Sequence, residues 1–390
     1  MSNWKYVKIG DVCIVERGGS PRPIDKYITE RKDGINWIKI GDTSDSMYIT
    51  STAQRIIPEG MKKSRYVKSG DFLLSNSMSF GRPYILKIDG CIHDGWLVLR
   101  DENDLFDKRF LYYYLSAPIT YEKFKKMAVG GVVNNLNSEM VRGVTIPLPP
   151  RTEQESIADT LDYVSNLISL RKQQLEKYDE LVKSRFIELF GSTGKQVPLT
   201  DYVWFQEGPG VRSVDFTDDG TILLTGSNIN DNAISFGHKS DRHISNELAS
   251  GKYAHFMCDK DDILVVSSAI DPDKFDKKVV VVDVDKKYCL NTGIIRFKPN
   301  KQYLTLGYFR EFLKTDYFKH QVSSEMRGIA QMHFGPSHLK QMAILLPDSI
   351  ERQVEFEAFV QQTDKSKLAI QKSLEKLEIL KKSLMQKYFG

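Results

Sequence analysis

The chain has 390 residues, of which 41% are hydrophobic and 27% charged, with a formal net charge of +4. That length accommodates two domains with cores of their own, and the composition is typical of a globular protein. No long apolar run and no basic N-terminus followed by an apolar stretch occurs, so we expect neither a membrane span nor a secretory signal. The scattered cysteines form no C-x-x-C pair, which argues against a zinc site or a disulfide framework and predicts a reducing, cytoplasmic location.

Residues 1–150 show short β-like runs and few helices. We predict strands at 36–40, 71–74 and 84–88, and helices at 106–115 and 120–127. The loops between them are rich in Gly, Ser, Asn and Arg. Such side chains hold phosphates and read base edges, although Gly, Asn and Ser are also the ordinary residues of turns. The candidate nucleic-acid contacts of this part are Ser20, Arg22, Lys39, Ser75, Asn76, Ser77, Arg82, His93, Asn134 and Asn135.

A long helix is predicted from about Glu153 to Phe190, a segment without Gly or Pro. Thr152 and Glu155 have capping-box spacing at its start, and Gly191 is a natural stop. Two interleaved series with a seven-residue period indicate a coiled-coil seam. They are Leu161, Ile168, Leu175, Val182 and Leu189, and Ile157, Val164, Arg171, Tyr178 and Arg185.

Residues 192–348 repeat the alternation of strands and loops. We predict strands at 221–224, 263–266 and 279–284, and a helix at 306–313. The loop residues with the same nucleic-acid chemistry are Arg212, Ser227, Asn228, Ser267, Ser268, Asn291, Thr292, Arg327 and Gln331. A second long helix follows at 349–390. The modest positive charge of the chain is compatible with a polyanionic partner.

The two halves of the chain are an internal duplication. Residues 183–191 read KSRFIELFG and residues 382–390 read KSLMQKYFG, at an offset of 199 positions. Further matches occur in the same order along both halves, including Gln154 with Gln353. A period near 200 residues is too long for a solenoid, so we predict two α+β domains in tandem, each followed by a long helix.

The charged breaks in the two helical seams differ between the copies. Arg171 and Arg185 fall where the second helix has Ile370 and Leu384, and two lysines, Lys367 and Lys381, replace apolar residues of the first. Such alternation favours one mutual arrangement of the two helices, so we predict that they form a coiled coil with each other. The alternative is that each amphipathic helix lies on its own domain.

Two short patterns resemble sites of other protein classes. The run from Gly191 to Lys195 ends like a phosphate-binding loop, but Leu189 and Gln196 do not fit that motif, so we interpret it as a helix stop and a linker. The histidines have no metal-ligand spacing, and no catalytic motif is found.

The second pattern is Asp273, Asp285 and Lys287, which fits the loose acidic motif of Mg²⁺-dependent nucleases. The first repeat has no counterpart of this triad, so we interpret the segment as a surface hairpin. A nuclease that uses these residues nevertheless remains an alternative function. A coiled-coil adaptor that binds only protein is another, and it would show no salt-dependent binding to DNA.

Three stretches resemble the specificity subunits of type I restriction–modification systems. They are Gly18 to Pro21, Asn36 to Asp42, and the run from Gly131 through IPLPPRTEQESIADTLD at 146–162. The last is the most specific, because a Pro-Pro turn and a Glu-Gln pair precede a long helix that closes in Phe-Gly. The second copy is degenerate, and the recognition domains match only in outline.

The resemblance implies two target-recognition domains, at 1–150 and 192–348, and two long helices, at 151–191 and 349–390, packed as an antiparallel coiled coil. Each domain would read one half of a bipartite site in double-stranded DNA from the major groove, with half-sites about one helical turn, ~34 Å, apart. Two methyltransferase (modification) subunits and two restriction subunits would bind this non-catalytic subunit. S-adenosylmethionine, ATP and Mg²⁺ would be used by those partners, and this subunit would hold no cofactor.

Overall fold

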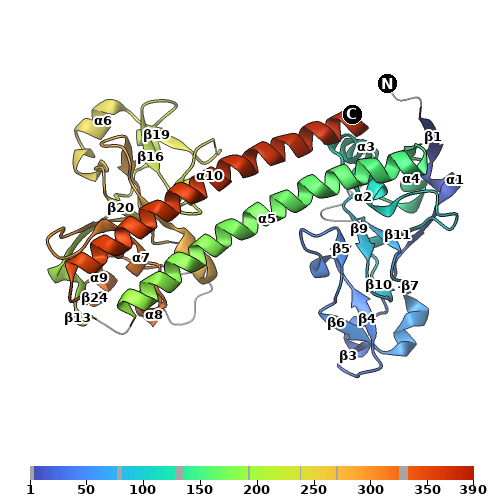
Figure 1. Cartoon of the computed structure of the whole chain (residues 1–390), viewed down its shortest axis with the longest axis horizontal. Coiled ribbons are helices and arrows are strands. Elements are labelled where there is room, and N and C mark those ends of the chain that lie inside the picture. The colour runs from blue at the N-terminus through green and yellow to red at the C-terminus, as the bar shows by residue number, and fades with distance from the viewer. Residues whose placement is uncertain are drawn as a thin grey trace. The chain divides into compact units, whose positions relative to one another are not determined.

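The computed structural model describes residues 4–76, 81–128, 135–191, 194–237, 239–268, 271–324 and 333–390. The chain divides into two compact units, unit 1 with residues 1–172 and 372–390 and unit 2 with residues 173–371. Each unit combines α-helices and β-sheets, as the sequence predicts (Figure 1). Both long helices contribute residues to both units.

The described part of unit 1 contains two five-stranded sheets and one two-stranded pair. The first sheet has the order β2 (Ile14–Arg17), β11 (Trp96–Arg100), β8 (Phe72–Ser75), β9 (Pro83–Leu86) and β5 (Tyr48–Ile49). The second has the order β3 (Ile28–Thr29), β6 (Gln54–Ile56), β4 (Ile35–Ile38), β10 (Gly90–Ile92) and β7 (Arg65–Val67). The pair is β1 (Lys5–Lys8) with β12 (Thr145–Leu148), and the short helices are α1 (Ile9–Val12), α2 (Lys108–Ser116), α3 (Pro118–Ala128) and α4 (Ser138–Arg142).

Unit 2 repeats this plan in its described residues. One sheet has the order β14 (Val203–Glu207), β23 (Ile294–Pro299), β20 (Ile263–Val266) and β21 (Val279–Val281). The other has the order β15 (Phe216–Thr217), β19 (Arg242–Ile244), β16 (Thr221–Leu224) and β22 (Tyr288–Leu290). Two pairs, β13 (Lys195–Pro198) with β24 (Ala343–Leu346) and β17 (Ile229–Asn230) with β18 (Ala233–Ile234), and helices α6 (Asn246–Ser250), α7 (Leu306–Phe312), α8 (Asp316–Ser324) and α9 (Pro336–Leu339) complete it. The predicted strands and helices are present, with ends that differ by a few residues.

The long helices are α5 (Arg151–Phe190) and α10 (Ile350–Phe389). Every seam position named above for the two helices is buried or half-buried, so the seven-residue period identifies their packed faces correctly. The proposed capping box is wrong, because α5 begins at Arg151 and Thr152 already lies inside its first turn. Glu155 instead accepts a hydrogen bond from Arg151 Nε at 3.1 Å.

Within each unit, segments of the two helices run antiparallel, and charged side chains pair between them. In unit 1, Lys172 of α5 is 4.0 Å from Glu378 of α10. In unit 2, Arg185 pairs with Glu355, and Lys367 pairs with Asp179. Two of the four predicted charged breaks, Arg185 and Lys367, therefore meet acidic partners on the opposite helix, in agreement with a mutual coiled coil.

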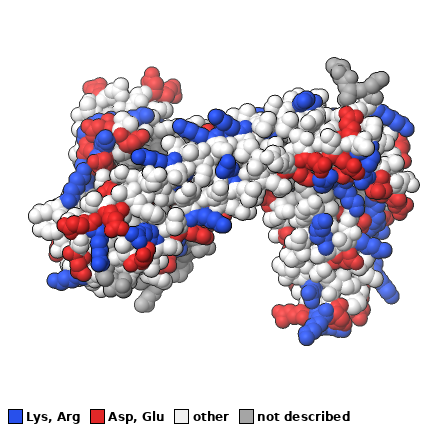
Figure 2. All heavy atoms as spheres, in the orientation of Figure 1, with Lys and Arg blue, Asp and Glu red and all other residues white. Residues whose placement is uncertain are grey.

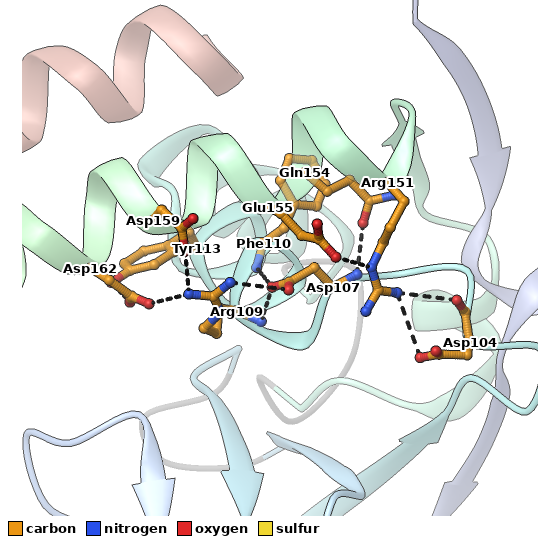
Figure 3. Close-up of polar contacts among 10 residues, drawn as sticks. All are labelled: Asp104, Asp107, Arg109, Phe110, Tyr113, Arg151, Gln154, Glu155, Asp159 and Asp162. Carbon is orange, nitrogen blue, oxygen red and sulfur yellow. Dashed lines mark hydrogen bonds and ion pairs between the residues drawn. The ribbon is translucent and has the colours of Figure 1, made fainter.

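The start of α5 is fixed to unit 1 by a polar cluster (Figure 3). The buried Gln154 accepts a hydrogen bond from the backbone N–H of Asp107 at 2.8 Å and donates to the carbonyls of Leu105 and Pro149. Gln353 repeats this in unit 2, where it accepts from the N–H of Thr305 at 3.0 Å and donates to a carbonyl of the same loop. The Gln pair found in the sequence thus marks two equivalent helix attachments.

Charged side chains reinforce the attachment in unit 1. The guanidinium of Arg109 lies between Asp107, Asp159 and Asp162, and Tyr113 donates its hydroxyl proton to Asp162 at 2.6 Å (Figure 3). In unit 2, the corresponding region holds Arg310 between Glu311 and Asp364 on α10. Both helices therefore begin as rigid continuations of a folded unit.

The phenylalanines of the two Phe-Gly endings are buried against the units. Phe389 packs edge-on against Phe110 and Tyr114 of α2, with ring centroids 5.6 and 5.7 Å apart. Phe190 packs in the same way against Tyr308 of α7, at 4.8 Å. Each aromatic ring therefore closes the hydrophobic core of a unit.

Candidate nucleic-acid interface

Loops that are distant in the sequence meet at one end of the main sheet in each unit. In unit 1, β11 is antiparallel to both β2 and β8, so its start lies beside the ends of those two strands. In unit 2, β23 is related to β14 and β20 in the same way. We call the converging segments the loop cluster: residues 17–23, 75–76, 93–95 and 135–136 in unit 1, and residues 208–215, 267–268, 291–293 and 333–335 in unit 2.

Backbone hydrogen bonds hold the unit 1 loop cluster together. The N–H of Gly18 donates to the carbonyl of Trp96 at 2.9 Å, and the N–H of Asn76 donates to that of Gly95 at 3.0 Å. The N–H of Leu136 then donates to the carbonyl of Asn76 at 3.0 Å. These bonds fix the loops as one rigid surface.

The same three bonds recur in unit 2. They run from Gly208 to Ile294, from Ser267 to Gly293 and from Phe334 to Ser267, at 3.0, 2.8 and 2.9 Å. The loop cluster is therefore built twice on one backbone plan, while its side chains differ between the copies.

Two glycines allow the closest approach of the loops. A Cβ atom on Gly18 would lie 2.1 Å from the carbonyl oxygen of His93, and a Cβ on Gly208 would lie 2.1 Å from that of Asn291. No side chain fits at either position without moving the backbone. His93 and Asn291 therefore occupy equivalent positions in the two units.

In unit 1, Asp94 is the central acceptor of the loop cluster. Its carboxylate accepts a hydrogen bond from Ser20 Oγ at 2.7 Å and lies 3.4 Å from Arg22 Nη2. Its backbone carbonyl accepts from Arg17 Nε and Asn76 Nδ2. The hydrogen bond from Ser20, together with the nearby His93 and Arg22, lowers the pKa of Asp94. The carboxylate therefore stays ionised and holds two candidate contact residues in place.

His93 is a fixed element of this surface. Its Nε2 faces the N–H of Ile40 at 3.1 Å, and its Nδ1 faces the N–H of Gly95 at 2.6 Å. A neutral imidazole has one acceptor nitrogen, and an imidazolium has none. Desolvation by burial lowers the pKa of His93, and the two facing N–H groups also disfavour the charged form.

In unit 2, Arg212 occupies the place of Arg22, since each lies four residues after the close-approach glycine. Its loop is anchored by the N–H of Thr292, which donates to the carbonyl of Pro209 at 3.0 Å. Next to it, Asp215 accepts from Lys252 Nζ at 2.9 Å and from Tyr253 Oη at 2.7 Å. These bonds lower the pKa of Asp215 and fix the base of the loop.

Eight candidates in the loop cluster are not fully buried. Five of them are Ser20, Arg22, His93, Arg212 and Thr292. Asn135, Ser268 and Asn291 also lie in it, half-buried, with Ser268 Oγ 2.6 Å from His333 Nδ1. The convergence of these residues was not predictable from their positions in the sequence.

Four candidates are buried, and the side chains of three of them, Ser75, Asn76 and Asn228, hold loops from within. Ser75, Asn76, Asn228 and Ser267 are at most 1% exposed. Ser75 accepts a hydrogen bond from the N–H of Arg82 at 2.9 Å, and Asn228 donates to Asp241 at 2.8 Å. Such burial does not fit a direct contact with DNA, and turn chemistry, the competing interpretation, explains Ser75, Asn76 and Asn228.

Three further candidates are not part of the loop cluster, although Lys39 and Arg82 adjoin it. Lys39 donates to Gln54 at 2.7 Å, and Ser227 bonds to the hydroxyls of Thr225 and Ser240. Arg82 is on the wall of a hollow of about 520 Å³. The candidates Ser77, Asn134, Arg327 and Gln331 lie outside the described residues.

Sequence reasoning missed Asp94 as a candidate, because carboxylates repel phosphates. The available signal was its position between His93 and Gly95 in a polar cluster. Its contacts show that an acidic residue organises the basic and hydroxyl side chains around it.

The nuclease-like pattern does not form a metal centre in the described part of the chain. Asp285 lies in an exposed turn and accepts a hydrogen bond from the N–H of Lys260 at 3.2 Å, and Lys287 lies over the ring of Tyr288. No group of three or more His, Cys, Asp or Glu side chains suits a metal there, and the side chain of Asp273 lies outside the described residues. The turn is also not a hairpin, because the flanking strands β21 and β22 belong to different sheets.

Charges of both signs occur on the face of the molecule that Figure 2 shows. Figure 2 shows basic and acidic side chains interspersed on the visible face, without one continuous positive patch. A nucleic-acid contact would therefore depend on local groups such as the loop cluster. Within the described residues, no helix has the length and apolarity that a membrane span requires.

Comparison with known proteins identifies the family. The type I restriction modification DNA specificity domain matches residues 1–178 and again residues 195–381. This chain belongs to the family of type I restriction–modification specificity subunits. The two matches coincide with the two halves of the duplication, so each half is one copy of the family's domain.

Similar proteins extend over nearly the whole specificity subunit. The MjaVIII specificity subunit of Methanocaldococcus jannaschii is 23% identical over 405 residues, covering 98% of this chain and 91% of the relative. A solved S subunit from M. genitalium has a TM-score of 0.54 at 16% identity, covering 100% of this chain and 96% of that one. A chain from a structure of type I R-M complex assembly has a TM-score of 0.56 at 15% identity, with 99% and 97% covered. Specificity subunits of this family are not the catalytic members of their systems.

Proposed function

We propose that this specificity subunit reads a bipartite target in double-stranded DNA, with the loop cluster of each unit reading one half-site. The observation that carries the proposal is the duplicated loop cluster, which has one backbone plan and two sets of side chains. One plan implies one mode of docking on DNA. Different side chains imply two different half-sites, since base edges are distinguished by side-chain donors and acceptors.

The partners in this proposal are two methyltransferase subunits and two restriction subunits. They would supply adenine methylation with S-adenosylmethionine and cleavage with ATP and Mg²⁺, and this subunit would bind none of these cofactors. The long helices support the scaffold role, because each is attached rigidly to a unit through Gln154 or Gln353. We place the assembly in the cytoplasm, where the four unpaired cysteines would remain reduced.

The test is to express this chain with its methyltransferase partner and to map N6-methyladenine across a host genome. We expect a bipartite motif with a fixed gap. Replacement of residues 1–150 by the corresponding part of another specificity subunit should change one half of that motif and leave the other half intact. Methylation at a continuous motif, or none with a demonstrably active partner, would contradict the proposal.

The nuclease alternative has its own test. Purified chain without partners is incubated with DNA and Mg²⁺, and the Asp285→Ala variant serves as the comparison. We expect no cleavage from either protein. Cleavage that disappears with Asp285→Ala would overturn the proposed function.

A further inference from the structure

Arg22 and Arg212 are equivalent residues in two different electrostatic settings. Each follows its close-approach glycine by four positions, and each is exposed at the surface of its loop cluster. The equivalence extends to the neighbouring loop, where Asp94 corresponds to Thr292. A duplicated scaffold thus carries an acidic residue beside Arg22 and a neutral residue, Thr292, at the equivalent position of the other copy.

The pair in unit 1 is well defined. Arg22 Nη2 lies 3.4 Å from Asp94 Oδ2, and the side chain of Arg22 is still 80% exposed. Asp94 is itself held by Ser20 Oγ at 2.7 Å. The carboxylate restrains one edge of the guanidinium and leaves its other N–H groups directed outward.

Arg212 has no such partner among the described residues. The carboxylate of Asp215 is close enough for the charge of Arg212 to contribute to its lowered pKa, but it forms no ion pair with Arg212 and already accepts hydrogen bonds from Lys252 and Tyr253. Among the described residues no carboxylate therefore holds Arg212 directly, and its exposed guanidinium is accessible to an anion.

A carboxylate beside an arginine acts differently on the two kinds of DNA contact. It repels a phosphate and cancels much of the charge that would release counterions. It does not repel the neutral edge of a base, and it stiffens the fork that donates to O6 and N7 of guanine. The presence or absence of a paired carboxylate therefore decides whether each arginine suits a base edge or a phosphate.

We propose that Arg22, positioned by Asp94, is a base-reading residue for a guanine in one half-site, and that Arg212 is a phosphate contact in the other. The inference rests on the proposed function and adds a division of labour between equivalent residues. Asp94 is a positioning residue in this scheme, because it acts through Arg22.

The experiment uses the complex of this chain with its methyltransferase partners. Two quantities are measured for each variant: the methylated motif, and the slope of log K against log salt concentration for a duplex that contains the motif. The variants are Arg22→Ala, Arg22→Lys, Asp94→Asn and Arg212→Ala. Arg31→Ala is the matched control, because Arg31 is also an exposed arginine paired with an aspartate, Asp33, but lies outside the loop cluster.

Arg22→Ala and Arg22→Lys should relax one base position of one half-site, with a loss of discrimination of roughly tenfold or more. Arg22→Ala should leave the salt slope unchanged. Asp94→Asn should relax the same position partly and steepen the slope, because the charge of Arg22 is then uncompensated. Arg212→Ala should weaken binding to all sequences and make the slope shallower by about 0.9, with the motif unchanged.

The inference is overturned if Arg22→Ala makes the slope shallower by about 0.9 without changing the motif, or if Arg212→Ala changes base identity. If the Asp94→Asn variant behaves like wild type, Asp94 does not position Arg22. A wild-type complex without a bipartite motif would instead refute the proposed function itself, so the two failures are distinguishable.

Discussion

At the scale of single residues, the loop cluster depends on glycines that leave room for neighbouring backbone as much as on its polar side chains. Gly18 and Gly208 do not have positive φ angles, so conformational freedom is not what they provide. Each leaves room for a carbonyl oxygen of the neighbouring loop, at a position where a Cβ would overlap it. The glycine-rich loops seen in the sequence therefore have a defined structural cause.

The glycine requirement is testable with a control two residues away. Gly208→Ala should cost about 1–3 kcal/mol or more, because the new Cβ must displace backbone. Gly210→Ala should be close to neutral, since an added Cβ would meet nothing within 4 Å. Urea denaturation measures both. Equal stability of the two variants would show that the loops move apart easily.

His93 makes the stability of unit 1 depend on pH. Its pKa is lowered in the folded chain, so the stabilisation is complete above the ordinary pKa near 6.5 and decreases as pH falls from there toward the folded value. The loss is at most about 1.4 kcal/mol per pH unit in that window. His93→Asn, which introduces the residue found at the equivalent position of unit 2, should remove this dependence. Denaturation at several pH values measures it, and parallel profiles for both proteins would contradict the assignment.

At the scale of elements, the long helices show how much of their packing a local sequence pattern predicts. The seven-residue period predicts the buried face of both helices, because side chains seven positions apart lie on one side of a helix. The period does not predict which acidic residue faces each seam cation. Arg185 with Glu355 and Lys367 with Asp179 are pairs between segments far apart in the sequence.

The phenylalanines of the Phe-Gly endings stabilise the fold, and the contribution of each to the free energy of unfolding can be measured. Phe190→Ala and Phe389→Ala should each cost about 3–5 kcal/mol, since both rings are at least nine-tenths buried among aromatic neighbours. Ile187→Ala is the control on the same helical turn, because Ile187 is 65% exposed. We expect it to change the free energy of unfolding by less than about 0.5 kcal/mol. Stable Phe→Ala variants that fail only to bind partners would assign the rings to an interface instead.

At the scale of the whole molecule, the duplication and the division into units do not coincide. Unit 1 takes residues 372–390 from the second repeat, so the ring that closes its core comes from the far end of the chain. A fragment of residues 1–191 lacks that ring but carries its equivalent, Phe190.

We therefore expect the 1–191 fragment to dimerise, with Phe190 of each copy covering Phe110 and Tyr114 of the other. Analytical ultracentrifugation at micromolar concentrations should show a dimer. The fragment with Phe190→Ala should shift toward monomer, whereas Ile187→Ala should not. A folded monomer of the unmodified fragment would contradict this expectation.

The sequence alone determined the duplication, the two long helices, their seam positions and the family resemblance, because these depend on short-range periodicity and on matches along the chain. Tertiary structure decided which loops converge, which of the candidates are buried, and that Asp94 stands beside Arg22 while Thr292 stands in the equivalent place near Arg212. These features depend on strand order, since antiparallel pairing of β11 with β2 and β8 brings together segments separated by more than 70 residues. Residue type alone does not distinguish a loop asparagine such as Asn228, which holds its own turn, from one that faces solvent.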